Sequence, residues 1–185
     1  MDAVSAALRA VPRAGFLPRG ARFRAGYDGP ITIGHGQTNS QPRTVEQMLR
    51  LLKVRAGDQI LDVGAGSGWS TALLAHLTGP EGSVVGVELV PKLAEWGAAN
   101  LARTPYDWAS IREPTPGVLG WPTSAPYDRI LVSADARSLP RPLVEQLAED
   151  GLLVVPVRGT MILGIRRGSE LETSEHGSYR FVPLL

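Results

Sequence analysis

The sequence predicts an α/β fold in which three layers form around a doubly wound, mostly parallel sheet with antiparallel strands at its C-terminal edge. Short apolar runs alternate with helical patterns from residue 59 to residue 155, which is typical of parallel strands joined by helices. A glycine-rich turn follows the first of these strands. Beyond residue 155 the helical pattern stops, which favours antiparallel edge strands. At 185 residues and 43% hydrophobic, the chain has the size of one domain covering 1–185.

The N-terminal part, residues 1–42, has little regular pattern. Val4, Ala7 and Leu8 recur at helical spacing until Pro12, so a short amphipathic helix is predicted to open the chain. The residues from 12 to 42 are rich in Gly, Pro and Arg, and we expect an irregular surface segment there. Loops of this length often contain functional residues.

The remaining part, residues 43–185, supplies the core. A helix with one apolar face is predicted from Pro42 to the break at residues 55–57. Strands are expected at 59–63, 84–87, 109–112, 129–132 and 152–155, with helices at 69–77, from 91 onward and at 142–147. Two antiparallel edge strands are expected at 161–165 and 179–182, separated by the polar stretch 166–178.

Net charge and composition exclude several classes of function. With 19 basic and 18 acidic residues the formal net charge is +1, so no large positive excess draws the chain to nucleic acid. The absence of cysteine removes disulfides and thiolate metal sites and fits a reducing compartment. No apolar run approaches the roughly 18 residues of a membrane-spanning helix. We therefore expect a cytoplasmic protein without a membrane or nucleic-acid partner. Separately, we expect a monomer.

The turn after the first predicted strand contains Gly64, Gly66 and Gly68. Glycines before a helix let backbone N–H groups approach a nucleotide-like ligand, and the alternative is a simple tight turn. Other glycine motifs do not fit. Trp69 stands where the dinucleotide fingerprint needs glycine, and no Gly-Lys-Ser/Thr of a P-loop follows. The glycines that a nucleophile elbow needs on either side are missing around Ser67.

Two acidic side chains accompany this turn. Glu88 follows the second strand, where a doubly wound fold places an acid that hydrogen-bonds a ribose; a solvated carboxylate is the alternative. Asp62 lies inside the first strand, where burying its charge is unfavourable unless loop amides or a ligand ammonium donate to it. An aminoacyl nucleoside has such an ammonium and NAD does not, so the pattern favours the former.

With residues 61–68 and Glu88 in place, the chain resembles the class I methyltransferases, and further blocks narrow the resemblance to the protein-L-isoaspartate (D-aspartate) O-methyltransferases. These blocks are Val11-Pro12-Arg13, Phe16-Leu17-Pro18, Pro30 to Pro42 with Gly34-His35-Gly36-Gln37-Thr38, Gly120-Trp121-Pro122, Ala125 to Ile130, and Arg180 to Leu184. The resemblance implies a Rossmann-like fold. It also implies methyl transfer from S-adenosylmethionine to the carboxylate of isoaspartyl residues in damaged proteins, with S-adenosylhomocysteine as product, which starts repair.

The resemblance further implies which residues form the site. It assigns the catalytic role to Ser40, beside the methyl donor; the alternative is that Ser40 caps the helix that begins near Pro42. The residues expected to bind the cofactor are Gln37, Thr38, Asn39, Ser40, Asp62, Gly64, Ala65, Gly66, Gly68, Glu88, Leu89 and Gly117, the first three of which also line the substrate pocket. The N-terminal helix and loop would lie on the substrate side. No metal site is expected, because His35, His76 and His176 lack ligand spacing.

The chain departs from the family pattern at three points. The family usually has Gly-Asp-Gly ahead of Gly-Trp-Pro, but this sequence has Thr115-Pro116-Gly117. Because Pro116 offers adenine neither a side-chain acceptor nor an N–H, we expect cofactor binding weaker by about 1–2 kcal/mol. The N-terminal segment is shorter than usual, and Asn39 replaces an apolar residue. Besides an active isoaspartyl methyltransferase, the alternatives are a related methyltransferase, a non-catalytic cofactor-binding relative and, least favoured, an NAD-dependent reductase.

Overall fold

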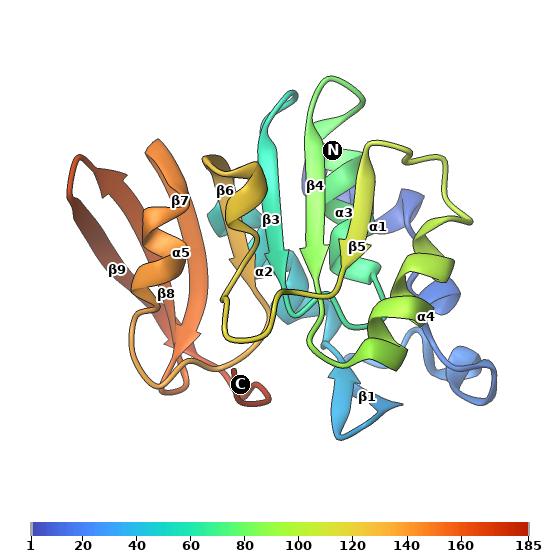
Figure 1. The fold of residues 1–185 in the computed structure, drawn as a ribbon. Coiled ribbons are helices and arrows are strands. Elements are labelled where there is room, and N and C mark those ends of the chain that lie inside the picture. Colours follow the sequence, from blue (N-terminus) through green and yellow to red (C-terminus); the bar gives the residue numbers. More distant parts are fainter. Residues whose placement is uncertain (1, 185) are drawn as a thin grey trace.

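A computed structural model describes residues 2–184, and its centre is one seven-stranded sheet with the order β5-β4-β3-β6-β7-β8-β9 (Figure 1). The strands are β3 Gln59–Val63, β4 Ser83–Val87, β5 Ala109–Arg112, β6 Tyr127–Val132, β7 Leu147–Val157, β8 Thr160–Arg167 and β9 Glu170–Ser178. Pairing is parallel from β5 to β7 and antiparallel for β8 and β9. The predicted sheet, with antiparallel strands at its C-terminal edge, is confirmed.

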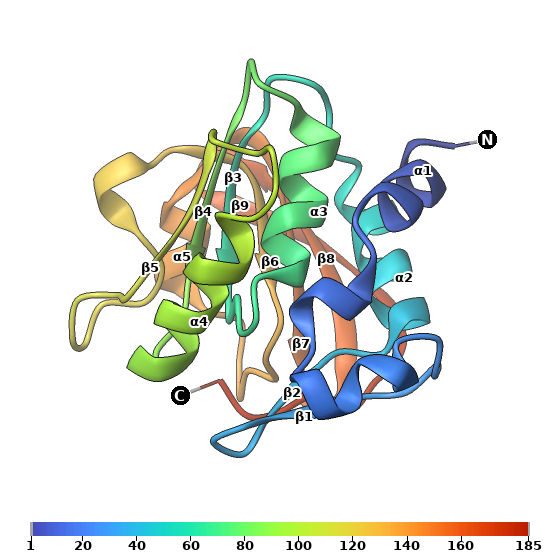
Figure 2. The same ribbon diagram turned by 90° about the vertical axis from the view of Figure 1, so that its right-hand side faces the viewer.

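Helices cover the two faces of this sheet unequally. One core contains residues of α1 (Ala3–Ala10), α2 (Pro42–Leu52), α3 (Trp69–Thr78) and α4 (Pro91–Leu101), and the other contains α5 (Arg141–Glu145). Figure 2 shows α1, α2 and α3 on the opposite side of the sheet from α5. Successive residues of β3 point to opposite faces of the sheet, so Ile60 packs in the first core and Leu61 packs in the second. No helix within residues 2–184 combines the length and apolarity needed to cross a bilayer.

The segment from 12 to 42 is more regular than predicted. It contains 3₁₀ helices at Arg13–Phe16 and Arg19–Arg24, then a hairpin of β1 (Ile31–Gly34) and β2 (Gln37–Asn39). The missed signal is the alternation of buried Ile31 and Ile33 with exposed neighbours. Gly34 and Gly36 close the hairpin turn with φ of 95° and 72°, a conformation that glycine adopts easily. The prediction of a wholly irregular segment was therefore wrong.

The C-terminal edge also differs from the prediction. β9 occupies 170–178, inside the stretch expected to separate the edge strands, and 179–182 lie outside any strand. Most residues of β9 are exposed, and an edge strand that is solvated on both faces carries no apolar alternation. β7 begins at Leu147, earlier than expected, and α5 ends at Glu145. Residues 179–184 return to the sheet, where Leu184 N–H donates to the Asp135 carbonyl at 2.9 Å.

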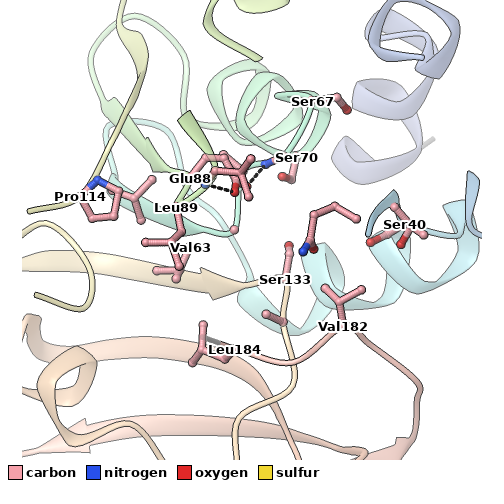
Figure 3. A pocket seen from close by; sticks show the side chains of 18 of the residues that line it. Ser40, Val63, Ser67, Ser70, Glu88, Leu89, Pro114, Ser133, Val182 and Leu184 are labelled. Carbon is pink, nitrogen blue, oxygen red and sulfur yellow. Dashed lines mark hydrogen bonds between the residues drawn. The ribbon is translucent and has the colours of Figure 1, made fainter. Parts of the chain in front are cut away.

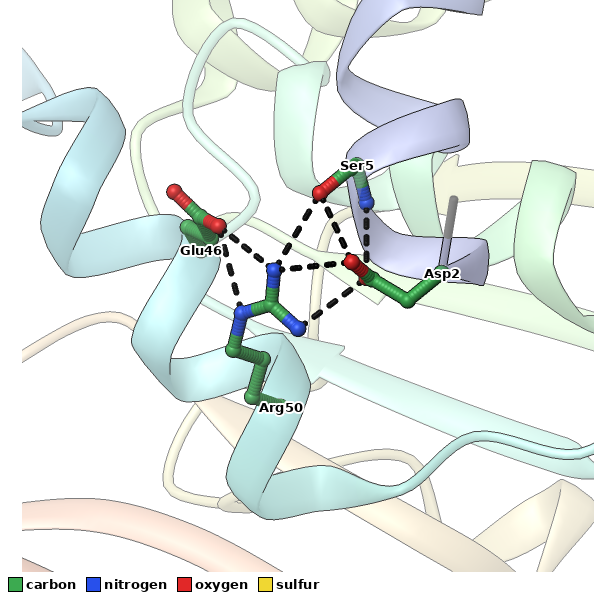
Figure 4. A network of polar contacts seen from close by, with 4 residues as sticks. All are labelled: Asp2, Ser5, Glu46 and Arg50. Atoms are coloured by element: carbon green, nitrogen blue, oxygen red, sulfur yellow. Dashed lines mark hydrogen bonds and ion pairs between the residues drawn. The ribbon is translucent and has the colours of Figure 1, made fainter.

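An exposed ion network ties α1 to α2 (Figure 4). Arg50 on α2 contacts Asp2 at 3.0 Å and Glu46 at 2.7 Å. Asp2 also caps α1, because it accepts a hydrogen bond from the backbone N–H of Ser5 at 3.1 Å. The guanidinium of Arg50, and then the donors of Ser5, lower the pKa of the Asp2 carboxyl. The N-terminal helix is thus attached to the body of the protein partly through solvated charges.

Candidate active site

A cavity of about 570 Å³ opens at the carboxyl ends of β3, β4 and β6. The chain order of the strands reverses beside β3, and doubly wound sheets bind ligands at such a switch point. The predicted site residues that line it are Gln37, Thr38, Asn39, Ser40, Gly64, Ala65, Gly66, Glu88, Leu89 and Gly117. Figure 3 shows Glu88 and Leu89 near Pro114, with Ser40 across from them. Two predicted residues, Asp62 and Gly68, are not among the residues that line the cavity.

The glycine turn separates into two parts with different roles. Gly64 and Gly66 line the cavity and have φ of 82° and 52°. Gly68 is the N-cap of α3, with φ of 89°, and a Cβ there would lie 2.9 Å from the Gly97 carbonyl oxygen on α4. Its missing side chain therefore lets α4 pack against the turn. This contact gives Gly68 a structural reason to be glycine.

Glu88 is the acid that faces the cavity, and it is 7% exposed. One carboxylate oxygen accepts the N–H of Gly66 at 2.8 Å, and the other accepts the N–H of Val90 at 2.9 Å (Figure 3). These bonds fix the carboxylate between the glycine turn and the end of β4. Since each carboxylate oxygen has a further lone pair, both can still accept from ligand hydroxyls.

Asp62 is fully buried under the glycine turn. Its Oδ2 accepts the hydroxyls of Ser70 and Thr71, both at 2.7 Å, while Oδ1 has no hydrogen-bond partner among residues 2–184. The donors are side chains of α3, whereas the sequence suggested loop amides or a ligand ammonium. Burial raises the pKa of Asp62 to about 6. The hydroxyl donors of Ser70 and Thr71 act in the opposite direction and lower this pKa, and the nearby Glu88 raises it further. Nowhere in 2–184 do three His, Asp or Glu side chains cluster as a metal site would need.

Arg13 organises the opposite wall, although sequence reasoning gave it no role. Its side chain is buried, and Nε donates to Oδ1 of Asn39 at 2.6 Å. Nη2 donates to the carbonyls of Gly29, Asn39 and Ser40 at 2.9, 3.0 and 2.9 Å. The guanidinium carbon also lies 5.6 Å from the centre of the Trp69 ring. One cation therefore joins the first 3₁₀ helix, β2 and α3.

Asn39 connects Arg13 to the glycine turn through its side-chain amide. It is 5% exposed, and its Nδ2 donates to the hydroxyl of Ser67 at 3.0 Å, while its Oδ1 accepts from Arg13. An amide can do both at once, whereas an apolar side chain can do neither. Asn39 thus links the two walls of the cavity, an interaction that the sequence did not suggest.

Ser40 lies half-buried at the cavity wall. The alternative that it caps α2 is wrong, because the N-cap position is Gln41 and no side chain of that residue caps the helix. Asp28 performs this role instead, accepting the N–H of Arg43 at 3.1 Å. The backbone carbonyl of Ser40 accepts a hydrogen bond from Arg13 at 2.9 Å, and Ser40 is among the residues that line the cavity.

Thr115 to Val118 form a turn at the cavity rim. The carbonyl of Thr115 accepts the N–H of Val118 at 2.9 Å, and Gly117 has φ of 78°. Proline in the second position and glycine in the third are the preferred residues of a type II turn. Thr115 and Gly117 line the cavity, whereas Pro116 does not. Pro116 therefore shapes the turn, and its effect on cofactor affinity stays a prediction.

Sequence reasoning missed the part of the wall formed by Ser133, Ala134 and the segment from Val182 to Leu184. Ser133 follows β6 directly and donates its N–H to the Val63 carbonyl at 2.8 Å. Its position at the carboxyl end of a central strand was a usable signal. For the C-terminal segment, the only signal in the sequence was its resemblance to the family's closing block. No local pattern could place this segment at the cavity, because its approach depends on the path of β8 and β9.

A mostly parallel seven-stranded sheet with a glycine turn, a strand-end acid and a cavity at its switch point defines the class I methyltransferase fold. Within this class, the sequence identifies one family. The chain belongs to the protein-L-isoaspartate(D-aspartate) O-methyltransferase family, whose sequence profile matches residues 1–185.

Individual relatives agree with this membership. The chain is 41% identical to the protein-L-isoaspartate O-methyltransferase of Methanopyrus kandleri over 187 aligned positions, covering 98% of this chain and 83% of the relative. It is 44% identical to that of Aeropyrum pernix, covering 97% and 71%. A crystal structure from Plasmodium falciparum, assigned as a protein-L-isoaspartate O-methyltransferase in complex with S-adenosyl-L-homocysteine, superposes with a TM-score of 0.88 at 26% identity, covering 100% and 91%.

Proposed function

We propose that this chain transfers a methyl group from S-adenosylmethionine to the carboxylate of L-isoaspartyl and D-aspartyl residues in damaged proteins, the first step of their repair. The observation that supports this most strongly is the family match over residues 1–185. Within the chain, residues 1–42 would form the substrate side and residues 43–185 the cofactor-binding core. We further propose a cytoplasmic monomer.

The cavity residues suit the methyl donor. A volume of about 570 Å³ is in the usual range for cofactor pockets. Glu88 would accept the ribose hydroxyls, the backbone from Gly64 to Gly66 would contact the amino-acid part, and Leu89 and Gly117 would flank the adenine. When bound, S-adenosylmethionine supplies an electrophilic methyl group on its sulfonium sulfur. The residues of the protein must then place the acceptor carboxylate beside this methyl group.

The protein's contribution is to position the acceptor and to exclude water. A carboxylate with an ordinary pKa of about 3.5–4 is ionised at neutral pH, so it attacks without a general base. Ser40 would donate its hydroxyl to one oxygen of this carboxylate and thereby aim the other. Gln37 and Thr38, on the same wall, would contact the substrate backbone. Since each of these residues lies on or next to β2, the hairpin would act as the positioning element.

A labelled-methyl assay on an isoaspartyl peptide and its normal aspartyl twin tests the function. We expect labelling of the isoaspartyl peptide alone. Ser40→Ala should lower the rate at least about tenfold while S-adenosylhomocysteine binds as before, and exposed Ser138→Ala is the matched control. An unchanged rate in Ser40→Ala would remove Ser40 from the catalytic role.

Isothermal titration with S-adenosylhomocysteine separates the remaining possibilities. Binding without labelling of either peptide would indicate a methyltransferase with another substrate or a non-catalytic relative. No binding, together with measurable binding of NAD, would contradict the methyltransferase assignment itself.

A further inference from the structure

A second cavity, of about 440 Å³, lies next to the first. Its lining residues are Leu17, Pro18, Arg19, Arg22, Ile33, Trp96 and Arg103. Ile33 lines both cavities, so its side chain is the common wall between them. The second cavity is formed where the N-terminal 3₁₀ helices meet α4, and no acidic residue of 2–184 lines it.

Three exposed arginines, Arg19, Arg22 and Arg103, are among the residues that line this second cavity. Nε of Arg22 makes a long hydrogen bond of 3.4 Å to the Leu17 carbonyl, and its Nη atoms remain for other partners. Within residues 2–184, neither Arg19, Arg22 nor Arg103 forms an ion pair. Like charges that share a cavity repel one another, and a bound anion relieves that repulsion. Because the net charge of the chain is only +1, this basic cavity is a local feature.

The rest of the lining restricts what the anion can be. Pro18 and Trp96 are half-buried, so apolar surface lies beside the basic groups. A carboxylate on a short methylene stem matches both parts, with the stem on the apolar surface and the oxygens on the guanidinium groups. A peptide whose modified residue enters the first cavity would continue outside it, and the second cavity is close by because Ile33 lines both.

We propose that the second cavity binds the carboxylate side chain of an acidic residue that neighbours the isoaspartate in the substrate. The proposal rests on the function proposed above, because the ligand is the flank of that substrate. Since the cavity lies on one side of Ile33, the preference is one-sided: an acidic residue on one side of the isoaspartate improves binding and one on the other side does not.

The test compares isoaspartyl peptides that carry glutamate one, two or three residues before or after the isoaspartate with an all-alanine flank. We expect glutamate on one side to lower KM roughly fivefold at low salt, with kcat little changed, and 0.5 M NaCl to weaken the effect. The double variant Arg19→Gln/Arg103→Gln should lose the preference but keep its rate on the alanine peptide. Arg141→Gln, an exposed arginine on α5, is the matched control.

Equal KM values for all peptides, an equal preference on both sides, or a preference that survives in the double variant would each overturn the proposal. The same peptides, labelled with fluorescein, give a second measurement by anisotropy that needs no turnover. If neither peptide is methylated, the proposed function fails, and the anisotropy comparison still decides whether the basic cavity selects an acidic flank.

Discussion

The wall of the main cavity that contains Gly66 and Glu88 lies at the ends of two neighbouring strands, whereas the wall that contains Asn39 and Ser40 depends largely on one buried side chain that is distant in sequence. In the first wall, Glu88 accepts backbone N–H groups that lie beside it at the strand ends. In the second wall, Arg13 donates to residues 26 and 27 positions away.

This difference indicates where each wall is vulnerable. Strand ends are held by the ladder of the sheet, so removing one side chain leaves their backbone in place. A buried guanidinium, in contrast, is tolerated only while its donors are satisfied, and its removal leaves several carbonyls without a partner. The wall proposed to bind the cofactor should therefore resist substitution, and the wall proposed to position the substrate should depend on Arg13.

Arg13→Ala should give the largest effect. We expect the free energy of unfolding to fall by about 3 kcal/mol, because buried carbonyls lose their donor, and methylation to fall more than about 100-fold. Affinity for S-adenosylhomocysteine should change less than about threefold, because the opposite wall remains. Urea unfolding, the peptide assay and calorimetric titration measure the three quantities. Exposed Arg9→Ala is the control, and equal losses of cofactor binding and activity in Arg13→Ala would break the comparison.

Asp62→Asn probes the support beneath the first wall through the pH dependence of stability. The folded state keeps its proton up to pH about 6, whereas the unfolded state releases it near 3.8, so the folded state binds more protons between these values. The wild type should therefore lose about 2 kcal/mol of stability as pH rises from about 4 to about 6. Asp62→Asn should lack this decrease, and exposed Asp107→Asn should retain it in urea unfolding at several pH values. Parallel curves for all three proteins would contradict the assignment.

Glu88→Gln tests the wall that contains Gly66 and Glu88, whereas Arg13→Ala tests the wall that contains Asn39 and Ser40. The amide turns one acceptor into a donor, so either Gly66 N–H or Val90 N–H loses its partner and one acceptor for ribose hydroxyls disappears. We expect affinity for S-adenosylhomocysteine to fall about tenfold, with KM for the peptide nearly unchanged. If the peptide KM rose as much as the cofactor Kd, the two walls would not act separately.

Arg50→Gln should give the smallest effect, because the network that it removes is exposed. We expect Tm to fall by no more than about 2 °C and activity to stay the same, with the difference disappearing at high salt. Because the pKa of Asp2 is lowered in the folded state, its contribution is present above pH 3.8 and is lost as pH falls below that value. A large loss of activity would show that α1 supports the substrate wall more strongly than its solvated contacts suggest.

Local pattern was sufficient for most of the sheet. β3, β4, β5 and β6 lie where their apolar runs placed them, and α2 and α3 follow helical spacing with Pro42 and Gly68 at their starts. β9 was misplaced because an exposed edge strand has no buried face to impose a period. The β1–β2 hairpin was overlooked because its strands are short and its Gly34-His35-Gly36 turn looks like loop sequence.

The sequence by itself therefore determined the order of the elements, the glycine turn, the strand-end acid and the family, because periods of 2 and 3.6 residues and contiguous blocks are visible within one segment. Only the tertiary structure decided that Arg13 holds Asn39 and Ser40, that Asp62 takes its donors from α3, and that Arg103 joins Arg19 and Arg22 around one cavity. These contacts join segments whose separation along the chain follows no spacing rule. They form only when the layers pack and bring distant polar groups out of water together, where each must find a partner.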